Sequence, residues 1–276
     1  MQVLKRLFDF YINSSMHVAF AVCGLVWVTL LNFNVGANLD FIYFIFFATV
    51  TGYNFVKYFG LAKFHHRSLA SWLKAIQIFS FLCFLGLCYF TFKLKTETLL
   101  YFIGLGVVTF LYAIPFLPKK IFLDAGNLRA ISGLKIYVIA FVWMSVTVII
   151  PLLNEDYSLN NDVLIEAIQR YLYVIIAMLP FEIRDMRYDS LKLSTIPQRI
   201  GIARTKIIGV LLTVLVFLLE FFKDEFWFNK MIILGIICML LFASLLLSNI
   251  NQKKYFSGFW VEGIPIIWAI LVTANY

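Results

Sequence analysis

Charged side chains are scarce in this chain of 276 residues. Lysine, arginine, aspartate and glutamate together make up 14% of it, hydrophobic residues make up 62%, and the mean hydropathy is +0.90. A soluble domain of this size does not need so many apolar residues. The shortage of charge excludes a soluble globular protein and predicts a polytopic membrane protein, organised as one domain over residues 1–276.

Cysteine is also sparse, and its four residues form no recognisable pattern. All lie in apolar runs, without a CxxC pair or a cluster of cysteine with histidine, so we expect neither a disulfide framework nor a zinc site. The chain has no basic soluble module, so its net charge of +8 does not predict a nucleic-acid partner. The apolar run after the basic start lacks a small-residue cleavage site, which predicts a retained first helix rather than a signal peptide.

Long apolar runs, by contrast, recur throughout the sequence. Each has about the 17 to 25 residues that a helix needs to cross about 30 Å of hydrocarbon. Their apolar residues are continuous, unlike the alternating strands of a membrane barrel. We therefore predict an all-α integral membrane protein with nine transmembrane helices. The predicted segments are 14–32, 40–58, 75–92, 98–117, 135–153, 163–181, 205–222, 231–249 and 258–275.

Lysine and arginine are distributed unevenly between the two sets of loops that nine spans create. With the N-terminus in the cytoplasm, 18 of the 23 basic residues fall on the cytoplasmic side and 5 on the other. Basic residues accumulate on the cytoplasmic side of membrane proteins. The distribution predicts a cytoplasmic N-terminus and an external C-terminus, in a membrane that we expect to be the inner membrane of a bacterium.

One polar segment, residues 181–201, directly follows the apolar run 171–181. Its three carboxylates are spaced by three and four residues, which on a helix would place them on one face. Such anions repel one another, and Mg²⁺ with a phosphorylated ligand would neutralise them, because Mg²⁺ binds through one or two carboxylates plus phosphate oxygens. A solvated helix end with local salt bridges is the alternative. The carboxylates are Glu182, Asp185 and Asp189, and the interleaved basic residues are Arg184, Arg187 and Lys192.

Nine helices with polar clusters after the second and sixth resemble the UbiA superfamily of intramembrane prenyltransferases, typified by 4-hydroxybenzoate polyprenyltransferase. The second motif of that family, DxxDxxxD followed by T-[LI]-P-x-R-x-G, is matched by Glu182, Asp185 and Asp189 and then by residues 195–201. The first acid is glutamate instead of aspartate, and the spacer before Thr195 is about one residue short. The resemblance covers nearly the whole chain in topology and about twenty residues in this specific motif.

This resemblance implies a fold, a reaction and a cofactor. The fold would be a UbiA-like helical bundle with a central cavity opening near the cytoplasmic side. The reaction would be Mg²⁺-dependent transfer of a prenyl group from an isoprenyl diphosphate to an apolar acceptor, aromatic or lipid-like, within the membrane lipid. Asp185 and Asp189 would be the catalytic ligands of Mg²⁺, with Glu182 as a further ligand.

The first motif of the family, NDxxDxxxD, is not preserved. Aligning its asparagine with Asn54 places Phe55, Tyr58 and Ala62 where the three aspartates would stand. Asn54 remains a candidate metal ligand through its amide oxygen, with a capping role at a loop or helix end as the alternative. An acidic metal site has therefore become a basic segment, which departs from the usual two-metal arrangement.

Basic residues on the cytoplasmic loops are candidates for binding the diphosphate, although ordinary topology also places such residues there. The loop after the fourth segment is similar to a Tyr–Pro–Lys segment of the family. One carboxylate, Glu262, stands at the start of the ninth segment, and intramembrane carboxylates are costly and often functional; helix capping is its alternative. The basic candidates are Lys57, Arg67, Lys119, Lys120 and Arg129.

Two other functions remain open from the sequence. A terpene cyclase on the same fold would ionise the diphosphate and use an internal alkene as the acceptor. A non-catalytic protein that binds isoprenoid lipid would explain the missing aspartates of the first motif. Products formed without an acceptor would select the cyclase, and the absence of Mg²⁺-dependent diphosphate binding would select the non-catalytic protein.

Overall fold

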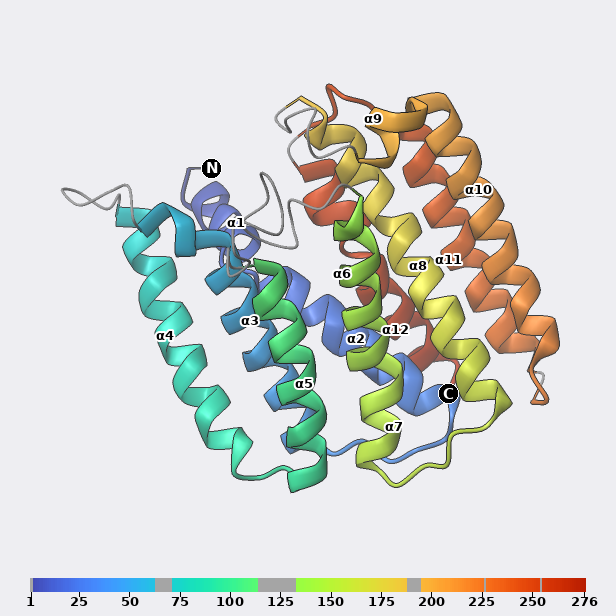
Figure 1. Cartoon of the computed structure of the whole chain (residues 1–276), viewed down its shortest axis with the longest axis horizontal. Coiled ribbons are helices and arrows are strands. Elements are labelled where there is room, and N and C mark those ends of the chain that lie inside the picture. Colours follow the sequence, from blue (N-terminus) through green and yellow to red (C-terminus); the bar gives the residue numbers. More distant parts are fainter. Residues whose placement is uncertain (1, 63–70, 114–132, 188–194, 226, 254) are drawn as a thin grey trace, which may run out of the picture.

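A computed structural model describes residues 2–62, 71–113, 133–187, 195–225, 227–253 and 255–276 of the chain. Every regular element within these ranges is a helix, and the long helices run side by side (Figure 1). The α-helices are α1 (Gln2–Asn13), α2 (Met16–Asn32), α3 (Leu39–Ala62), α4 (Ser71–Thr91), α5 (Thr96–Ala113), α6 (Leu134–Met144), α7 (Ile150–Asn154), α8 (Asn161–Asp185), α9 (Ile196–Ile200), α10 (Ile202–Leu219), α11 (Phe228–Leu247) and α12 (Ile264–Ala274).

Three short segments of other helical types extend or join these helices. The π-helix η2 (Ser145–Ile149) joins α6 to α7, and the π-helix η5 (Phe256–Val261) precedes α12. The 3₁₀ helix η4 (Glu220–Phe222) ends α10. Single π-helical turns within longer helices are uncommon and are found frequently at functional sites.

Helices occur at all nine predicted transmembrane segments, and the all-α prediction is confirmed for the described residues. Seven helical stretches there are long and apolar enough to cross a membrane, and an eighth arises if the bent pair α1 and α2 counts as one span. The remaining apolar helix, Thr96–Leu111, is shorter. The structure therefore supports an integral membrane protein, while the number nine stays a prediction.

The sequence does not predict the bend at the start of the chain. Helices α1 and α2 meet at an angle of 55°, and Ser15 between them has the left-handed φ of 62°. Serine rarely adopts this conformation, so neighbouring contacts must hold the backbone there. The predicted first span therefore corresponds to α2, with α1 as a separate helix.

Helix α2 lies at the centre of the bundle, where it packs against α3, α12 and η2. Its residues Leu25, Val26 and Val28 are buried. The approach to α12 is close, because a Cβ atom added at Gly24 would lie 3.1 Å from the carbonyl oxygen of Pro265. The outer helices expose large apolar side chains such as Phe81 and Leu211, which is the surface that lipid requires.

Two ends of the bundle can be distinguished in Figure 1. The carboxyl end of α8 lies at the upper end together with α9 and α1, and we call this the motif end. The amino end of α8 lies at the lower end, which we call the opposite end. The C-terminus lies towards the opposite end, where the Tyr276 hydroxyl contacts the side chain of Asn34 at 3.3 Å.

Candidate functional site at the motif end

Helix α8 ends within the acidic motif. Asp189 lies outside the described residues, so its place on one helical face with Glu182 and Asp185 stays a prediction. Asp185 is the last residue of α8 and Met186 is its C-cap, so the described helix ends there. A physical reason is the helix dipole, since carboxylates at a helix carboxyl end are unfavourable and an arginine there is favourable. Arg184 supplies that cation in the last turn.

Asp185 is half-buried and forms an ion pair with its neighbour. The Nε of Arg184 donates to its Oδ1 at 2.7 Å, and the two side chains are 27% and 23% exposed. The second oxygen, Oδ2, has no hydrogen-bond partner within the described ranges. Asp185 therefore offers a carboxylate oxygen at the surface of the motif end.

Glu182 has a different environment from Asp185. Its side chain is buried, and its Oε2 accepts a hydrogen bond from the backbone N–H of Ile196, at the start of α9, at 3.3 Å. The same helix start is closed by Gln198, whose side chain accepts from the N–H of Thr195 at 3.0 Å. A carboxylate is favourable at a helix amino end. Glu182 thus connects the two parts of the predicted motif.

Arg184 also connects α8 to the π-helix η5. Its Nη1 donates to the Ser257 hydroxyl at 2.9 Å. Gln252 donates to the same hydroxyl at 3.2 Å and to the carbonyl of Pro180 at 3.0 Å. These bonds fix the last turn of α8 against the start of the last span.

Glu262 directly follows η5 and is half-buried. It lies within electrostatic range of Lys57 and Arg184, and Tyr11 lies within range of its charge. Its side chain makes no hydrogen bond or ion pair with another described residue. A carboxylate inside a membrane span that is balanced by nearby cations is a candidate functional group.

Asn54 and Lys57 hold the end of α1. The Asn54 amide accepts from the Ser15 hydroxyl at 2.8 Å and donates to the carbonyl of Ser14 at 2.9 Å and to the hydroxyl of Ser80 at 2.7 Å. The Nζ of Lys57 donates to the carbonyl of Asn13 at 3.1 Å. These bonds favour the structural alternative for Asn54, since its Oδ1, the atom that a metal would need, already accepts from Ser15 and both amide hydrogens are used.

Aromatic residues pack between α1, the start of α2 and η5. His17 is buried and stacks on Phe259, with Nε2 2.9 Å from the Phe259 carbonyl and Nδ1 2.9 Å from the Tyr11 hydroxyl. Since a carbonyl only accepts, Nε2 donates, and a neutral ring then accepts from Tyr11 at Nδ1. The Tyr255 hydroxyl donates to Asp9.

Several predicted site residues lie outside the described ranges. They are Asp189, Arg67, Lys119, Lys120 and Arg129. Their proposed roles remain predictions from the sequence. The contacts described above bring five predicted site residues to the motif end: Asn54, Lys57, Glu182, Asp185 and Glu262.

The motif end offers few ligands for Mg²⁺. The described part of the chain contains no group of three or more histidine, cysteine, aspartate or glutamate residues that could hold a metal ion. A magnesium ion bound with a diphosphate needs only one or two carboxylates from the protein. Asp185, with its available Oδ2, fits this smaller requirement, whereas Glu182 already accepts from the start of α9.

A second charged cluster, which the sequence did not predict, lies at the opposite end. Arg170, one of the five basic residues assigned above to the external side, is completely buried, and its Nη2 donates to Glu166 at 2.8 Å. Its guanidinium also donates to the carbonyl of Leu25 and to the hydroxyls of Thr29 and Thr147. The sequence signal that could have indicated this ion pair is the spacing of four residues between Glu166 and Arg170 in an apolar helix.

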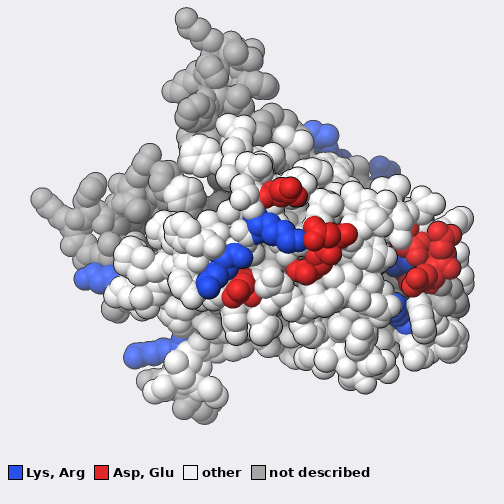
Figure 2. All heavy atoms as spheres, turned by 90° about the horizontal axis from the view of Figure 1, so that it is seen from below, with Lys and Arg blue, Asp and Glu red and all other residues white. Residues whose placement is uncertain are grey.

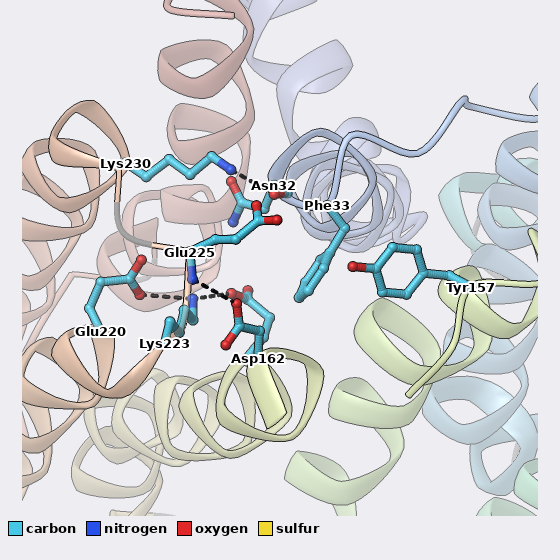
Figure 3. A pocket seen from close by; sticks show the side chains of 9 residues that line it. Asn32, Phe33, Tyr157, Asp162, Glu220, Lys223, Glu225 and Lys230 are labelled. Atoms are coloured by element: carbon cyan, nitrogen blue, oxygen red, sulfur yellow. Dashed lines mark hydrogen bonds and ion pairs between the residues drawn. The ribbon is translucent and has the colours of Figure 1, made fainter. Parts of the chain in front are cut away.

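Lys223 completes this cluster. Its Nζ lies 2.8 Å from carboxylate oxygens of both Glu166 and Glu220, between α8 and the end of α10 (Figure 3). Burial alone would lower the pKa of Lys223, but the two carboxylates outweigh that effect and raise the pKa above its ordinary value of 10.5. The adjoining cavity has a volume of about 20 Å³, roughly the space of one water molecule. Figure 2 shows acidic and basic side chains gathered on this otherwise uncharged end.

The fold and the motif end together define a class of protein: a polytopic helical membrane protein with a polar site at one end of its bundle. No protein-family model matches the sequence, and no curated protein matches it. A UbiA homologue from Archaeoglobus fulgidus bound to GPP and Mg²⁺ is similar in structure, with a TM-score of 0.58, 12% identity, and coverage of 96% of this chain and 98% of that chain.

A second similar structure concerns digeranylgeranylglyceryl phosphate synthase in membranes. It has a TM-score of 0.55 and 16% identity, and covers 98% of this chain and 97% of that chain. A further structure of a UbiA homologue from Archaeoglobus fulgidus has a TM-score of 0.50 and 13% identity. The chain therefore has the UbiA fold over nearly its whole length.

Proposed function

We propose that this chain is a UbiA-superfamily enzyme that transfers a prenyl group from an isoprenyl diphosphate to an apolar acceptor, with Mg²⁺. The observation that carries the proposal is the second motif at the end of α8, where Asp185 offers a carboxylate oxygen and Glu182 contacts the start of α9. The similar structure bound to GPP and Mg²⁺ supports the same ligand class for this site.

The residues that would bind the diphosphate lie around the end of α8. Asp185, together with Asp189, would hold Mg²⁺, and Arg184 and Lys57 would add positive charge beside it, as would Arg67, Lys119, Lys120 and Arg129. When bound, Mg²⁺ would neutralise the diphosphate and act as a Lewis acid. The basic side chains would stabilise the negative charge that grows on the leaving diphosphate as the allylic carbon–oxygen bond breaks.

The aromatic residues beside η5 would protect the allylic cation that remains. The rings of Phe8 and Phe259 lie 5.0 Å apart, and His17 stacks on Phe259. Aromatic faces attract cations, and an apolar enclosure keeps out the water that would hydrolyse the cation. Glu262, within range of Lys57 and Arg184, would balance their charge and would receive the proton that the acceptor releases.

Release of diphosphate from a labelled isoprenyl diphosphate tests this proposal. The protein in lipid nanodiscs is assayed with a mixture of apolar aromatic and lipid-like acceptors, with Mg²⁺ or with EDTA. We expect Mg²⁺-dependent release that falls at least about 100-fold in Asp185→Asn, since charge stabilisation at the leaving group is typically worth about 2.7–4 kcal/mol. Asp156→Asn, an exposed aspartate at the opposite end, is the matched control.

Two outcomes would contradict the proposal. Full diphosphate release by Asp185→Asn would remove this residue from the reaction. Failure of the wild-type protein to release diphosphate with any acceptor would exclude the transferase, whereas release with a cyclised product and no acceptor would identify a cyclase.

A further inference from the structure

Helix α1 has one apolar face that the protein covers over only part of its length. In its second half this face packs on the bundle, with the ring of Phe8 against Tyr255 and the ring of Phe10 against Phe79. In its first half the same face is bare, and the side chains of Val3, Leu4 and Leu7 are exposed. Something outside the described chain must cover these three residues in the native environment.

The polar face of α1 is basic beside this bare patch. Lys5 and Arg6 are exposed, and neither forms an ion pair with any residue that the structure describes. Asp9, the acid on that face, accepts a hydrogen bond from Tyr255. A helix with exposed apolar residues on one side and unpaired basic residues on the other suits the surface of an anionic membrane.

The level of α1 along the bundle also matches a membrane interface. Tyr58 donates to the carbonyl of Asn13, at the end of α1, at 2.7 Å, and its ring contacts Trp72 edge-on. Trp72 is 53% exposed in the first turn of the apolar helix α4. Tryptophan is enriched where spanning helices meet the lipid headgroups, so α1 joins the bundle at headgroup level.

The bend before α2 turns α1 away from the direction of the spanning helix. The two helices meet at 55°. Lys57 and Tyr58 donate to the carbonyl of Asn13, the last residue of α1, and Asn54 donates to the carbonyl of Ser14 in the turn that follows. These bonds fix the tilt of α1 relative to the bundle. The arrangement differs from a loose N-terminal tail, because three side-chain hydrogen bonds from α3 set the tilt.

We infer that α1 is an interfacial helix that binds anionic lipid. Val3, Leu4 and Leu7 insert among the acyl chains, while Lys5 and Arg6 contact the negative headgroups. Lys57 is one of the three α3 residues that hold this helix. Helix α3 therefore connects the lipid contact of α1 to the motif end. The inference does not depend on the proposed reaction.

The test measures the depth of α1 in nanodiscs that contain one full-length protein each. A bimane label at Leu4→Cys is compared with the same label at Lys5→Cys, after subtracting the signal of the identically labelled wild-type chain. The discs contain phosphatidylcholine with or without phosphatidylglycerol, and the quenchers are acyl-chain doxyl lipid and aqueous iodide. We expect doxyl to quench the Leu4 label more strongly than iodide does, and the reverse order for Lys5.

Charge reversal separates anionic lipid from a general apolar contact. With the label at Leu4→Cys, the substitutions Lys5→Glu and Arg6→Glu should lower quenching by doxyl phosphatidylglycerol about five-fold per charge. Quenching by doxyl phosphatidylcholine should change little, and Lys93→Glu at the opposite end should alter neither. Quenching of the Leu4 label mainly by iodide would overturn the inference. Protection of the Leu4 label from both quenchers would overturn it as well. So would charge reversal that lowers quenching by doxyl phosphatidylglycerol and by doxyl phosphatidylcholine equally.

Discussion

The two ends of helix α8 carry similar residues in different settings. Glu166 and Arg170 form an ion pair at the opposite end, with side chains 3% and 0% exposed. Arg184 and Asp185 form an ion pair at the motif end, with side chains 27% and 23% exposed. Lys223 satisfies the second oxygen of Glu166, whereas the second oxygen of Asp185 has no partner in the described part of the chain.

This difference separates a structural cluster from a binding site. Buried charges must be paired, because an uncompensated charge in the interior is strongly destabilising. Half-exposed charges with unused acceptor oxygens cost less and can take a ligand. We therefore expect mutations at the opposite end to affect folding, and mutations at the motif end to affect ligand binding and turnover.

The largest effect on stability is expected from Arg170→Met. This change leaves two buried carboxylates, Glu166 and Glu220, with Lys223 as their one described cation, and should lower the free energy of unfolding by about 3–5 kcal/mol. Thermal unfolding in detergent measures the loss. The double variant Glu166→Gln/Arg170→Met should recover part of it, because it removes both charges; an unfolding midpoint unchanged by Arg170→Met would contradict a structural role.

Lys223→Met should have the next largest effect. It removes the shared cation of Glu166 and Glu220, and leaving such groups unsatisfied typically costs about 1–3 kcal/mol. The raised pKa of Lys223 gives a pH signature. Because the folded pKa lies above the ordinary value of 10.5, this stabilisation is fully present below pH 10.5 and is lost as the pH rises through the folded value. The stability difference between Lys223→Met and wild type should therefore stay constant from neutral pH up to 10.5 and shrink only above it.

Glu262→Gln, at the motif end, should affect turnover more than stability. Loss of this carboxylate should lower turnover about ten-fold or more if it receives the acceptor's proton, and should leave thermal stability nearly unchanged, since it makes no described side-chain hydrogen bond. Turnover is measured by diphosphate release and stability by the unfolding midpoint. A large loss of stability with normal turnover would make Glu262 a structural residue.

Lys95→Ala is expected to have the smallest effect. The Lys95–Asp156 pair has a separation of 2.7 Å, but its side chains are 50% and 81% exposed. Exposed ion pairs typically contribute no more than about 1 kcal/mol. The unfolding midpoint should hardly move. A shift as large as that of Arg170→Met would show that burial does not determine how much an ion pair contributes to the stability of this protein.

Much of the fold could be predicted from the sequence, because long apolar runs dominate it. The motif at residues 182–201 was also visible as a pattern of acids followed by a threonine, proline and arginine. The end of α8 at Asp185 was not predicted, since periodicity does not report where a helix dipole disfavours more acids. A structural role for Asn54 was one of two alternatives, but its partners Ser14, Ser15 and Ser80 could not be predicted, and the burial of Arg170 was missed, because these contacts join residues distant in sequence.

The most direct test of the central claim is the thermal stabilisation of the protein by isoprenyl diphosphates of several chain lengths. Wild type, Asp185→Asn and Arg170→Lys are compared with and without Mg²⁺. A ligand at 100 times its Kd stabilises the folded state by about 2.7 kcal/mol. We predict a Mg²⁺-dependent shift in wild type that is lost in Asp185→Asn and retained in Arg170→Lys; an equal shift in Asp185→Asn, or no shift at any chain length, would contradict a diphosphate site at the motif end.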